Sequence, residues 1–265
     1  MDRKSKLSSA KNYALYYGSG RAIELAKYDI AIVEPAGQSV NSLREFKTSG
    51  TLAIAYLSVM EIPSWSEEIS SLNSSDFLHV EGSENPYINQ KYGNYWLDLR
   101  SQRWTDLLLH RIAYLLEGVG YDGLFLDAVG YVESLQIPMT LRSALQLAAA
   151  QIVCKIKTRF PGYILIQNCG LEELYKLTVG YIDGICWENP PLDRVASQEW
   201  AAQVIRNLEQ VKATYGLQVF LLAEENDSCA REFRRVKELA FAKQFLAYYA
   251  PANYTAGVSL INGYE

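Results

Sequence analysis

The segment Asp122-Gly-Leu-Phe-Leu-Asp127 carries a carboxylate at each end of a short apolar run, five residues apart. The same pattern recurs as Asp29-Ile-Ala-Ile-Val-Glu34 and as Asp183-Gly-Ile-Cys-Trp-Glu188. Side chains alternate between the two faces of a β-strand, so an odd offset directs the acids of each pair to opposite faces. If the closing acids point inward, three carboxylates surround one apolar interior. Buried carboxylates are costly unless they have partners, so these acids are candidates for chemistry.

Eight apolar runs alternate with amphipathic stretches, which predicts an α/β fold, a single (β/α)8 barrel, instead of an open sheet. The runs are apolar throughout, as in parallel strands covered on both faces. The expected strands are 13–17, 30–34, 52–58, 123–127, 163–167, 184–188, 219–224 and 247–250, and the expected helices include 104–117, 141–159, 198–215 and 231–245. The repeated pattern then falls on strands 2, 4 and 6. Its closing acids should share a layer at the carboxyl-terminal mouth, where such barrels carry their active sites.

The chain has 265 residues, 49% of them apolar, which is enough for one barrel without a second domain. We therefore expect residues 1–265 to form a single domain. One connection, at about 59–101, is much longer than a usual loop and is rich in Ser, Asn, Glu and aromatic residues. Because this loop insertion follows the third strand, it should form part of the wall over the active face and present Trp65, Tyr87, Tyr92 or Tyr95 there.

The bulk properties exclude several kinds of partner. A net charge of -5 argues against a nucleic acid. No apolar run reaches the roughly 18 residues of a membrane span, so no membrane partner is expected. The first residues are basic and polar without an apolar core, so we expect no signal peptide. No pattern specifies an oligomeric state.

Histidine and cofactor chemistry have little support. The chain has two histidines, His79 in the long connection and His110 in a helical pattern. This argues against a Ser-His-Asp relay and against a histidine-rich zinc site. GxxxxGK[ST] does not occur, and the GxGxxG match at Gly118-Val-Gly-Tyr-Asp-Gly123 precedes an expected strand instead of following one, so a bound nucleotide has little support. We therefore expect no metal and no other cofactor.

Carboxylate chemistry remains. Acids follow several expected strands, as do aromatic side chains, and this combination suits glycoside hydrolysis. The acids are Glu34, Glu61, Asp127, Glu188, Glu224 and Glu225, and the aromatics are Tyr56, Trp65, Tyr131, Trp187 and Tyr248. The alternatives are that the acids form salt bridges or cap helices, and that the aromatic rings pack in the core or on its rim.

Five segments, in order, resemble one enzyme family over roughly residues 13 to 250. They are Ile54-Ala-Tyr-Leu-Ser-Val-Met-Glu61, Tyr95-Trp-Leu-Asp-Leu-Arg100, Tyr121-Asp-Gly-Leu-Phe-Leu-Asp-Ala-Val-Gly-Tyr131, Ile164-Leu-Ile-Gln-Asn168 and Ile182-Asp-Gly-Ile-Cys-Trp-Glu188. They are similar to segments of glycoside hydrolase family 114. This family comprises endo-α-1,4-polygalactosaminidases and related hydrolase domains of bacterial exopolysaccharide systems.

The resemblance implies that Asp127 and Glu188 are the catalytic pair, which the spacing argument also selects. It implies a metal-independent endo-glycosidase acting on an α-1,4-linked, galactosamine-type polysaccharide. The substrate-binding residues expected from the resemblance and the strand ends are Glu34, Tyr56, Glu61, Trp65, Asp98, Tyr131, Asn168, Trp187, Glu224 and Tyr248. It also implies an extracellular or cell-surface location, whereas the missing signal peptide leaves a cytoplasmic one as the alternative. Two other functions stay open, a non-catalytic carbohydrate-binding barrel and a carboxylate-based enzyme acting on a different sugar.

Overall fold

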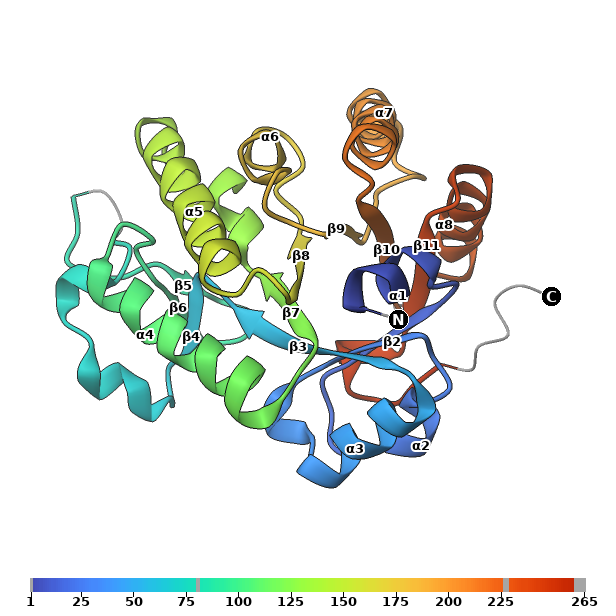
Figure 1. The fold of residues 1–265 in the computed structure, drawn as a ribbon. Coiled ribbons are helices and arrows are strands. Elements are labelled where there is room, and N and C mark those ends of the chain that lie inside the picture. Colours follow the sequence, from blue (N-terminus) through green and yellow to red (C-terminus); the bar gives the residue numbers. More distant parts are fainter. Residues whose placement is uncertain (1, 80–81, 226–228, 260–265) are drawn as a thin grey trace.

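The structure is a computed structural model that describes residues 2–79, 82–225 and 229–259. Eight parallel strands form one sheet in the order β1-β2-β3-β7-β8-β9-β10-β11, and β1 lies beside β11, so the sheet curls into a nearly closed barrel (Figure 1). The strands are β1 Tyr13–Tyr16, β2 Ile30–Val33, β3 Leu52–Ser58, β7 Gly123–Asp127, β8 Ile164–Asn168, β9 Gly184–Glu188, β10 Gln218–Glu224 and β11 Leu246–Ala250. The predicted (β/α)8 architecture is confirmed.

Helices surround the strands (Figure 1). They are α1 Arg3–Ser9, α2 Ala22–Leu25, α3 Val40–Ser49, α4 Gln102–Ala113, α5 Met139–Arg159, α6 Leu174–Thr178, α7 Gln198–Tyr215 and α8 Cys229–Lys243. The sequence predicts the helix after the long connection as one element over 104–117. In the structure its last part, Tyr114–Val119, is a π-helical turn that ends at Gly120 in the left-handed region.

Local sequence signals explain where these elements begin and end. The strand cores are buried on both faces, as continuous apolar runs predict for parallel strands. The Ser101 hydroxyl accepts a hydrogen bond from the backbone N–H of Trp104 and so caps the start of α4. Ser39 caps α3 in the same way, and α3 ends at Gly50, whose φ of 89° suits glycine.

The strand register brings the functional side chains to one face of the sheet. Tyr56 pairs with Phe125, Ser58 with Asp127, and Asn168 with Cys186. Alternate residues share a face, so Tyr56, Asp127, Asn168 and Glu188 all point the same way, into the barrel mouth. Glu34 directly follows β2, in the position that continues the inward face of that strand. The closing acids of the repeated pattern therefore lie at the carboxyl ends of β2, β7 and β9, the second, fourth and sixth barrel strands, as the five-residue offset predicts.

The opening acids of the same pattern have a separate role at the amino end of the barrel. Asp29 Oδ2 accepts a hydrogen bond from the backbone N–H of Lys11, just before β1, at 2.7 Å. Asp122 Oδ2 accepts from the N–H of Ala53 at 3.1 Å. Asp183 Oδ2 likewise accepts from the N–H of a neighbouring strand, at Leu165, at 2.9 Å. Each opening acid thus satisfies a strand-end donor that would otherwise lack a partner.

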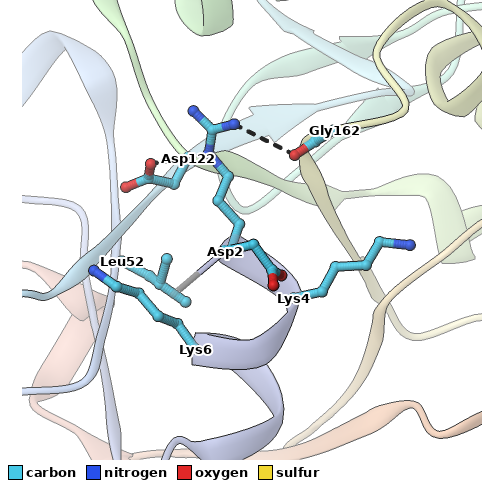
Figure 2. Close-up of a pocket in the computed structure, with 7 residues that line it drawn as sticks. Asp2, Lys4, Lys6, Leu52, Asp122 and Gly162 are labelled. Atoms are coloured by element: carbon cyan, nitrogen blue, oxygen red, sulfur yellow. Dashed lines mark hydrogen bonds and ion pairs between the residues drawn. The ribbon is translucent and has the colours of Figure 1, made fainter.

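Helix α1 lies across this amino end, in the centre of Figure 1. Its side chains form ion pairs with two of the opening acids: Arg3 Nε lies 3.1 Å from Asp122 Oδ1, and Lys4 Nζ lies 3.2 Å from Asp183 Oδ1. Figure 2 shows the hollow beside α1, lined by Asp2, Arg3, Lys4, Lys6, Leu52, Asp122 and Gly162. Arg3 and Lys4 of this hollow pair with barrel acids. The hollow therefore belongs to the packing of α1 on the barrel, at the end opposite to the closing acids.

The long connection at 59–101 contains a small antiparallel sheet. Its strands are β4 Glu61–Pro63, β5 Ile88–Asn89 and β6 Asn94–Trp96, in the order β4-β6-β5. The small sheet appears in cyan at the left of Figure 1, outside the ring of barrel strands. A hydrogen bond from the Tyr87 hydroxyl to the carbonyl of Gln136 joins this segment to the loop that follows β7.

Candidate active site

Asn168 joins the two acids that the sequence selects as a catalytic pair. Its Nδ2 donates one hydrogen bond to Asp127 Oδ1 and another to Glu188 Oε2, both at 2.7 Å. The three residues end neighbouring strands β7, β8 and β9, so the sheet itself fixes their order. Because the two bonds of 2.7 Å meet at one nitrogen, these carboxylate oxygens cannot lie further apart than twice that bond length.

Each acid has a tyrosine on its remaining oxygen. The Tyr56 hydroxyl donates to Asp127 Oδ2 at 3.0 Å. The Tyr254 hydroxyl donates to Glu188 Oε1 at 2.5 Å. The ring of Tyr17 lies between these two tyrosines, with centroid distances of 4.5 Å to Tyr56 and 5.4 Å to Tyr254. The pair is therefore held on both sides by hydroxyl donors whose rings pack in one aromatic cluster.

The surroundings of Glu188 favour its protonated form. Burial is the largest effect that raises the pKa of Glu188, and the nearby charge of Asp127 raises it further. Hydrogen bonds from Tyr254 and Asn168 act in the opposite direction, because they stabilise the ionised carboxylate. Burial also raises the pKa of Glu34 and of Glu61. Within the described residues, no Lys or Arg forms an ion pair with Glu34, Asp127 or Glu188.

The other predicted acids are placed differently. Glu34 is half-buried and accepts a hydrogen bond from the N–H of Ala36, 3.2 Å away, at the start of the short helical turn that follows it. Glu224 ends β10 and accepts from the N–H of Asn253 at 2.8 Å. Glu225 is exposed at the same edge. All three lie at the carboxyl-terminal end of the barrel, as expected.

Glu61 is 5% exposed and serves the small sheet. Its Oε1 accepts from Asn89 Nδ2 at 2.7 Å and from Trp96 Nε1 at 3.0 Å, and its Oε2 accepts from Asn94 Nδ2 at 3.0 Å. These donors come from β5 and β6, so one carboxylate joins all three strands of the sheet. The contacts indicate an anchor for segment 59–101 more than a group held ready for substrate.

Replacing Glu61 with Ala should therefore destabilise the protein by about 3 kcal/mol, because one buried donor and two half-buried donors lose their acceptor at once. Glu61→Gln is the matched control and should cost less, since its amide oxygen still accepts a hydrogen bond. Equilibrium denaturation with urea measures both free energies of unfolding. A loss below about 1 kcal/mol for Glu61→Ala would contradict the anchoring role.

Two of the predicted aromatic residues, Tyr131 and Trp65, differ in exposure. Tyr131 packs on Trp96 with a centroid distance of 5.2 Å, and the charges of Glu61, Asp127 and Glu188 add to burial in raising the pKa of its hydroxyl. Trp65 follows β4 and is 82% exposed.

Tyr92 is also exposed, in the turn between β5 and β6. The neighbouring Lys91 has its pKa raised by the Tyr92 hydroxyl and, more weakly, by the charges of Glu224 and Glu188. This turn of the small sheet therefore reaches toward the acids of β9 and β10.

Three predicted substrate contacts make other contacts within the protein. Trp187 is 2% exposed, and its ring packs edge-on against Trp200 of α7, because it precedes Glu188 on β9 and so faces the helices. Tyr248 is buried in the core, with ring contacts to Tyr13 and Tyr28. Asp98 is occupied by a bidentate hydrogen-bonded pair with Arg100 two residues later. The burial of Trp187 and Tyr248 corrects two of these expectations, and the one for Asp98 stays a prediction.

Sequence reasoning missed Tyr17, Asn189 and Tyr254. Tyr17 directly follows β1, on its inward face, so the alternation rule applied to the first strand identifies it. Asn189 follows Glu188 with a φ of 46° and donates from Nδ2 to the Tyr254 hydroxyl at 3.3 Å. Tyr254 has no strand pattern to mark it, since it lies in a turn beyond β11.

No group of three or more His, Cys, Asp or Glu side chains in the described part of the chain is arranged to hold a metal ion. No helix among the described residues is long and apolar enough to cross a membrane. The mouth holds two carboxylates in different environments, Asp127 and Glu188. The Asn168 amide donates to both of them, and a tyrosine hydroxyl donates to each. That set can protonate a leaving oxygen and stabilise or attack an electron-poor carbon.

Residues 3–189 match the model of glycoside-hydrolase family GH114. Among solved structures, the glycoside hydrolase domain of PelA from Pseudomonas aeruginosa has a TM-score of 0.75 at 21% identity, covering 93% of this chain and 96% of that chain. Aspergillus fumigatus Ega3, solved in complex with galactosamine, has a TM-score of 0.69 at 14% identity, covering 96% and 95%. The α-galactosidase TtGalA from Thermus thermophilus has a TM-score of 0.60 at 15% identity, covering 90% and 58%. No curated protein sequence matches.

At these identities the structural likeness shows the barrel fold alone. The family match covers most of the chain and includes β7 and β9, the strands that carry Asp127 and Glu188. It confirms the resemblance seen in the five sequence segments, and with it the glycosidase class. The chain therefore belongs to glycoside-hydrolase family GH114.

Proposed function

We propose that the protein is an endo-acting hydrolase of an α-1,4-linked galactosamine-type polysaccharide, with Asp127 and Glu188 as its carboxylate pair and without a metal or nucleotide cofactor. The observation that carries the proposal is the single amide of Asn168 bonded to both carboxylates. A salt bridge or helix cap would neutralise such acids, whereas here two carboxylates face one another across the mouth of a barrel.

The separation of the pair supports a retaining mechanism. Retaining glycosidases hold their carboxyl groups about 5–5.5 Å apart, and inverting ones about 6.5–9.5 Å apart to admit a water. Asp127 Oδ1 and Glu188 Oε2 are separated by no more than two bonds of 2.7 Å, which fits the first class.

The environments of the two acids support a division of roles. Burial and the neighbouring charge raise the pKa of Glu188, so it can hold a proton near neutral pH and act as the acid. Asp127 receives donors from Tyr56 and Asn168 on its two oxygens, which suits an anionic nucleophile.

The reaction then has two steps. In the first, Glu188 gives its proton to the glycosidic oxygen, the bond from that oxygen to the anomeric carbon breaks, and a carboxylate oxygen of Asp127 bonds to the carbon. In the second, ionised Glu188 takes a proton from water, the water oxygen bonds to the anomeric carbon, and Asp127 leaves as a carboxylate.

The charges at the mouth support an amino sugar as the substrate. Glu34, Glu224 and Glu225 stand around the catalytic pair, and acidic clefts concentrate cationic ligands. Free ammonium groups on the polymer would supply that positive charge, and galactosamine is the sugar bound in the Ega3 structure. In this proposal the exposed rings of Trp65 and Tyr92, both in segment 59–101, receive further sugar units of a chain. A polymeric substrate of this kind supports a place of action outside the cell or at its surface.

The test of this function is mass spectrometry of a partially deacetylated α-1,4-galactosamine polymer after incubation with the protein. Oligosaccharides of several lengths are expected, as internal cleavage produces. Recovery of the intact polymer bound to the protein would instead identify a carbohydrate-binding barrel. Cleavage of only neutral polymers in the same panel would move the enzyme to a different sugar.

Charge recognition makes a separate prediction. Activity on the deacetylated polymer should fall as salt rises, because screening within about 8–10 Å at physiological ionic strength weakens exposed pairs. Chemical N-acetylation of the polymer should reduce cleavage, since it removes the ammonium charges. Glu224→Gln combined with Glu225→Gln should weaken binding of the deacetylated polymer more than that of the acetylated one. Glu224→Gln keeps an acceptor for the N–H of Asn253, so the turn should survive. Equal activity on both polymers at all salt concentrations would exclude ammonium recognition.

A further inference from the structure

The hydroxyl of Tyr254 is the middle member of a chain of hydrogen bonds that runs from Asn189 to Glu188, the proposed acid/base. Asn189 Nδ2 donates to the Tyr254 hydroxyl oxygen at 3.3 Å, and that hydroxyl donates to Glu188 Oε1 at 2.5 Å. Asn189 comes directly after β9, whereas Tyr254 comes from the turn η7 Ala252–Tyr254 beyond β11. Two separate loops therefore meet at the Tyr254 hydroxyl, which bonds to Glu188 Oε1.

The backbone fixes the direction of this chain. The N–H of Glu224 donates to Asn189 Oδ1 at 2.8 Å, which identifies that atom as the oxygen of the amide and leaves the amino group facing Tyr254. An amide amino group only donates, so it cannot receive the hydroxyl hydrogen. Within the described part of the chain, the acceptor that this hydrogen meets is Glu188 Oε1.

The turn that carries Tyr254 is strained and firmly held. Asn253 and Tyr254 have φ values of 56° and 57°, in the left-handed region that a tyrosine rarely adopts. The N–H of Tyr17, after β1, donates to the Tyr254 carbonyl at 2.8 Å, and Glu224 Oε1 accepts from the N–H of Asn253 at 2.8 Å. Strain of this kind persists where the surroundings enforce it, and it often marks a functional position.

We propose that Tyr254, oriented by Asn189, is a positioning residue that confines the acid proton of Glu188 to Oε2. The proposal rests on the acid/base role of Glu188 in the proposed function. Both oxygens of Glu188 accept a hydrogen bond, Oε1 from the Tyr254 hydroxyl at 2.5 Å and Oε2 from Asn168 Nδ2 at 2.7 Å. The protonated oxygen of a carboxylic acid is the weaker acceptor, so the proton favours Oε2, whose donor makes the longer bond, and leaves Oε1 to accept from Tyr254. Because Asn168 also contacts Asp127, Oε2 lies on the side of Glu188 that faces the nucleophile, where the leaving oxygen has to be.

Tyr254 also sets how readily Glu188 gives up its proton. Its donated hydrogen bond stabilises the ionised carboxylate and so lowers the pKa of Glu188, against the larger effects of burial and Asp127, which raise it. Without the hydroxyl, the proton should be held more tightly. The charged groups that face Glu188 are Asp127 from β7, Glu224 from β10 and Lys91 from segment 59–101. Four further titratable groups lie near it, Tyr17, Tyr131, Cys169 and Cys186.

The test is a carbon-13 NMR titration of the Glu188 carboxyl in protein labelled at glutamate, with the spectrum of Glu188→Gln identifying the signal. Tyr254→Phe should raise the pKa of Glu188 by about 0.5–1 unit, because one donor to the anion is lost. Asn189→Gly should raise it by a smaller amount, since the hydroxyl remains but is no longer oriented. Glycine tolerates the φ of 46° at this position.

Tyr121→Phe is the matched control, because the Tyr121 hydroxyl is buried without a hydrogen-bond partner. It should leave the Glu188 titration unchanged. On the polymer, Tyr254→Phe should lower kcat about 10-fold with little change in KM and shift the alkaline limb of the pH profile upward. An unchanged Glu188 titration in a folded Tyr254→Phe variant would overturn the proposal. The titration needs no substrate, so a shift without any turnover in the wild type would refute the proposed function alone.

Discussion

Replacing Asp127 with Asn, or Glu188 with Gln, is expected to lower turnover of the polymer at least about 10³-fold while the protein stays folded. Each change keeps the shape and an acceptor oxygen but removes the group that bonds to carbon or moves the proton. Burial raises the pKa of Glu188, which means that the ionised carboxylate destabilises the folded protein relative to the protonated one. The stability that the protonated form contributes is therefore lost as the pH rises through this raised pKa. The melting temperature of Glu188→Gln at neutral pH should therefore equal or exceed that of the wild type.

Initial rates by reducing-sugar release and melting curves of the same samples test this expectation. Asp106→Asn, on the exposed face of α4, is the matched control and should retain full activity. If either variant of the pair keeps more than about a tenth of wild-type activity, that residue does not belong to the pair.

Removing the amide between the acids should have the next largest effect. Asn168→Ala is expected to lower kcat about 10²-fold, because the only described donor that contacts both carboxylates is lost and the pair no longer keeps its separation. Loss of a donor to the anion should also raise the pKa of Glu188 and shift the alkaline limb of the pH profile upward. The measurement is kcat and kcat/KM across pH.

Asn207→Ala on α7 provides the control for Asn168→Ala, since its side chain pairs only with the same helix in the contacts described, through Gln203. It should leave both the rate and the pH profile unchanged. An Asn168→Ala enzyme within about threefold of the wild type, with an unshifted profile, would show that the bridge is dispensable.

The period of a β-strand explains how much of the site the sequence could predict. An offset of five residues places Asp122 and Asp127 on opposite faces whatever the rest of the chain does, and each has a role, one below the barrel and one at its mouth. The same rule excludes Trp187, which is adjacent to Glu188 on one strand and must face the helices. Proximity to a strand end does not distinguish the two faces of the strand, so it does not by itself place an aromatic ring at the mouth.

The sequence could not predict which side chains from distant segments contact one another. The position of Glu61 after β3 predicts a cleft acid, but its partners Asn89, Asn94 and Trp96 lie much further along the chain, in a sheet that no local pattern indicates. Tyr248 has the position of an inward residue and still fills the core, because Tyr13 and Tyr28 occupy the space around it. Such placements depend on packing, which composition and periodicity do not encode.

Tyr254 depends on a different kind of information. Its side chain reaches Glu188 because two consecutive residues adopt left-handed backbone conformations after the last strand. Neither residue is glycine, the usual sign of such a turn in a sequence. The hydrogen bonds from the N–H of Tyr17 and to Glu224 that hold the turn exist only once the barrel has formed.

The most direct test of the carboxylate pair is the configuration of the first product. Proton NMR of the anomeric region, recorded within the first minutes of cleavage of the α-linked polymer, shows which anomer is released before mutarotation. The two bonds of 2.7 Å from Asn168 limit the separation between Asp127 Oδ1 and Glu188 Oε2, and this short separation predicts a retaining reaction. The α-anomer should therefore appear first and the β-anomer only later. Initial release of the β-anomer would contradict the account, because a water would then have to fit between carboxylates that one amide holds together.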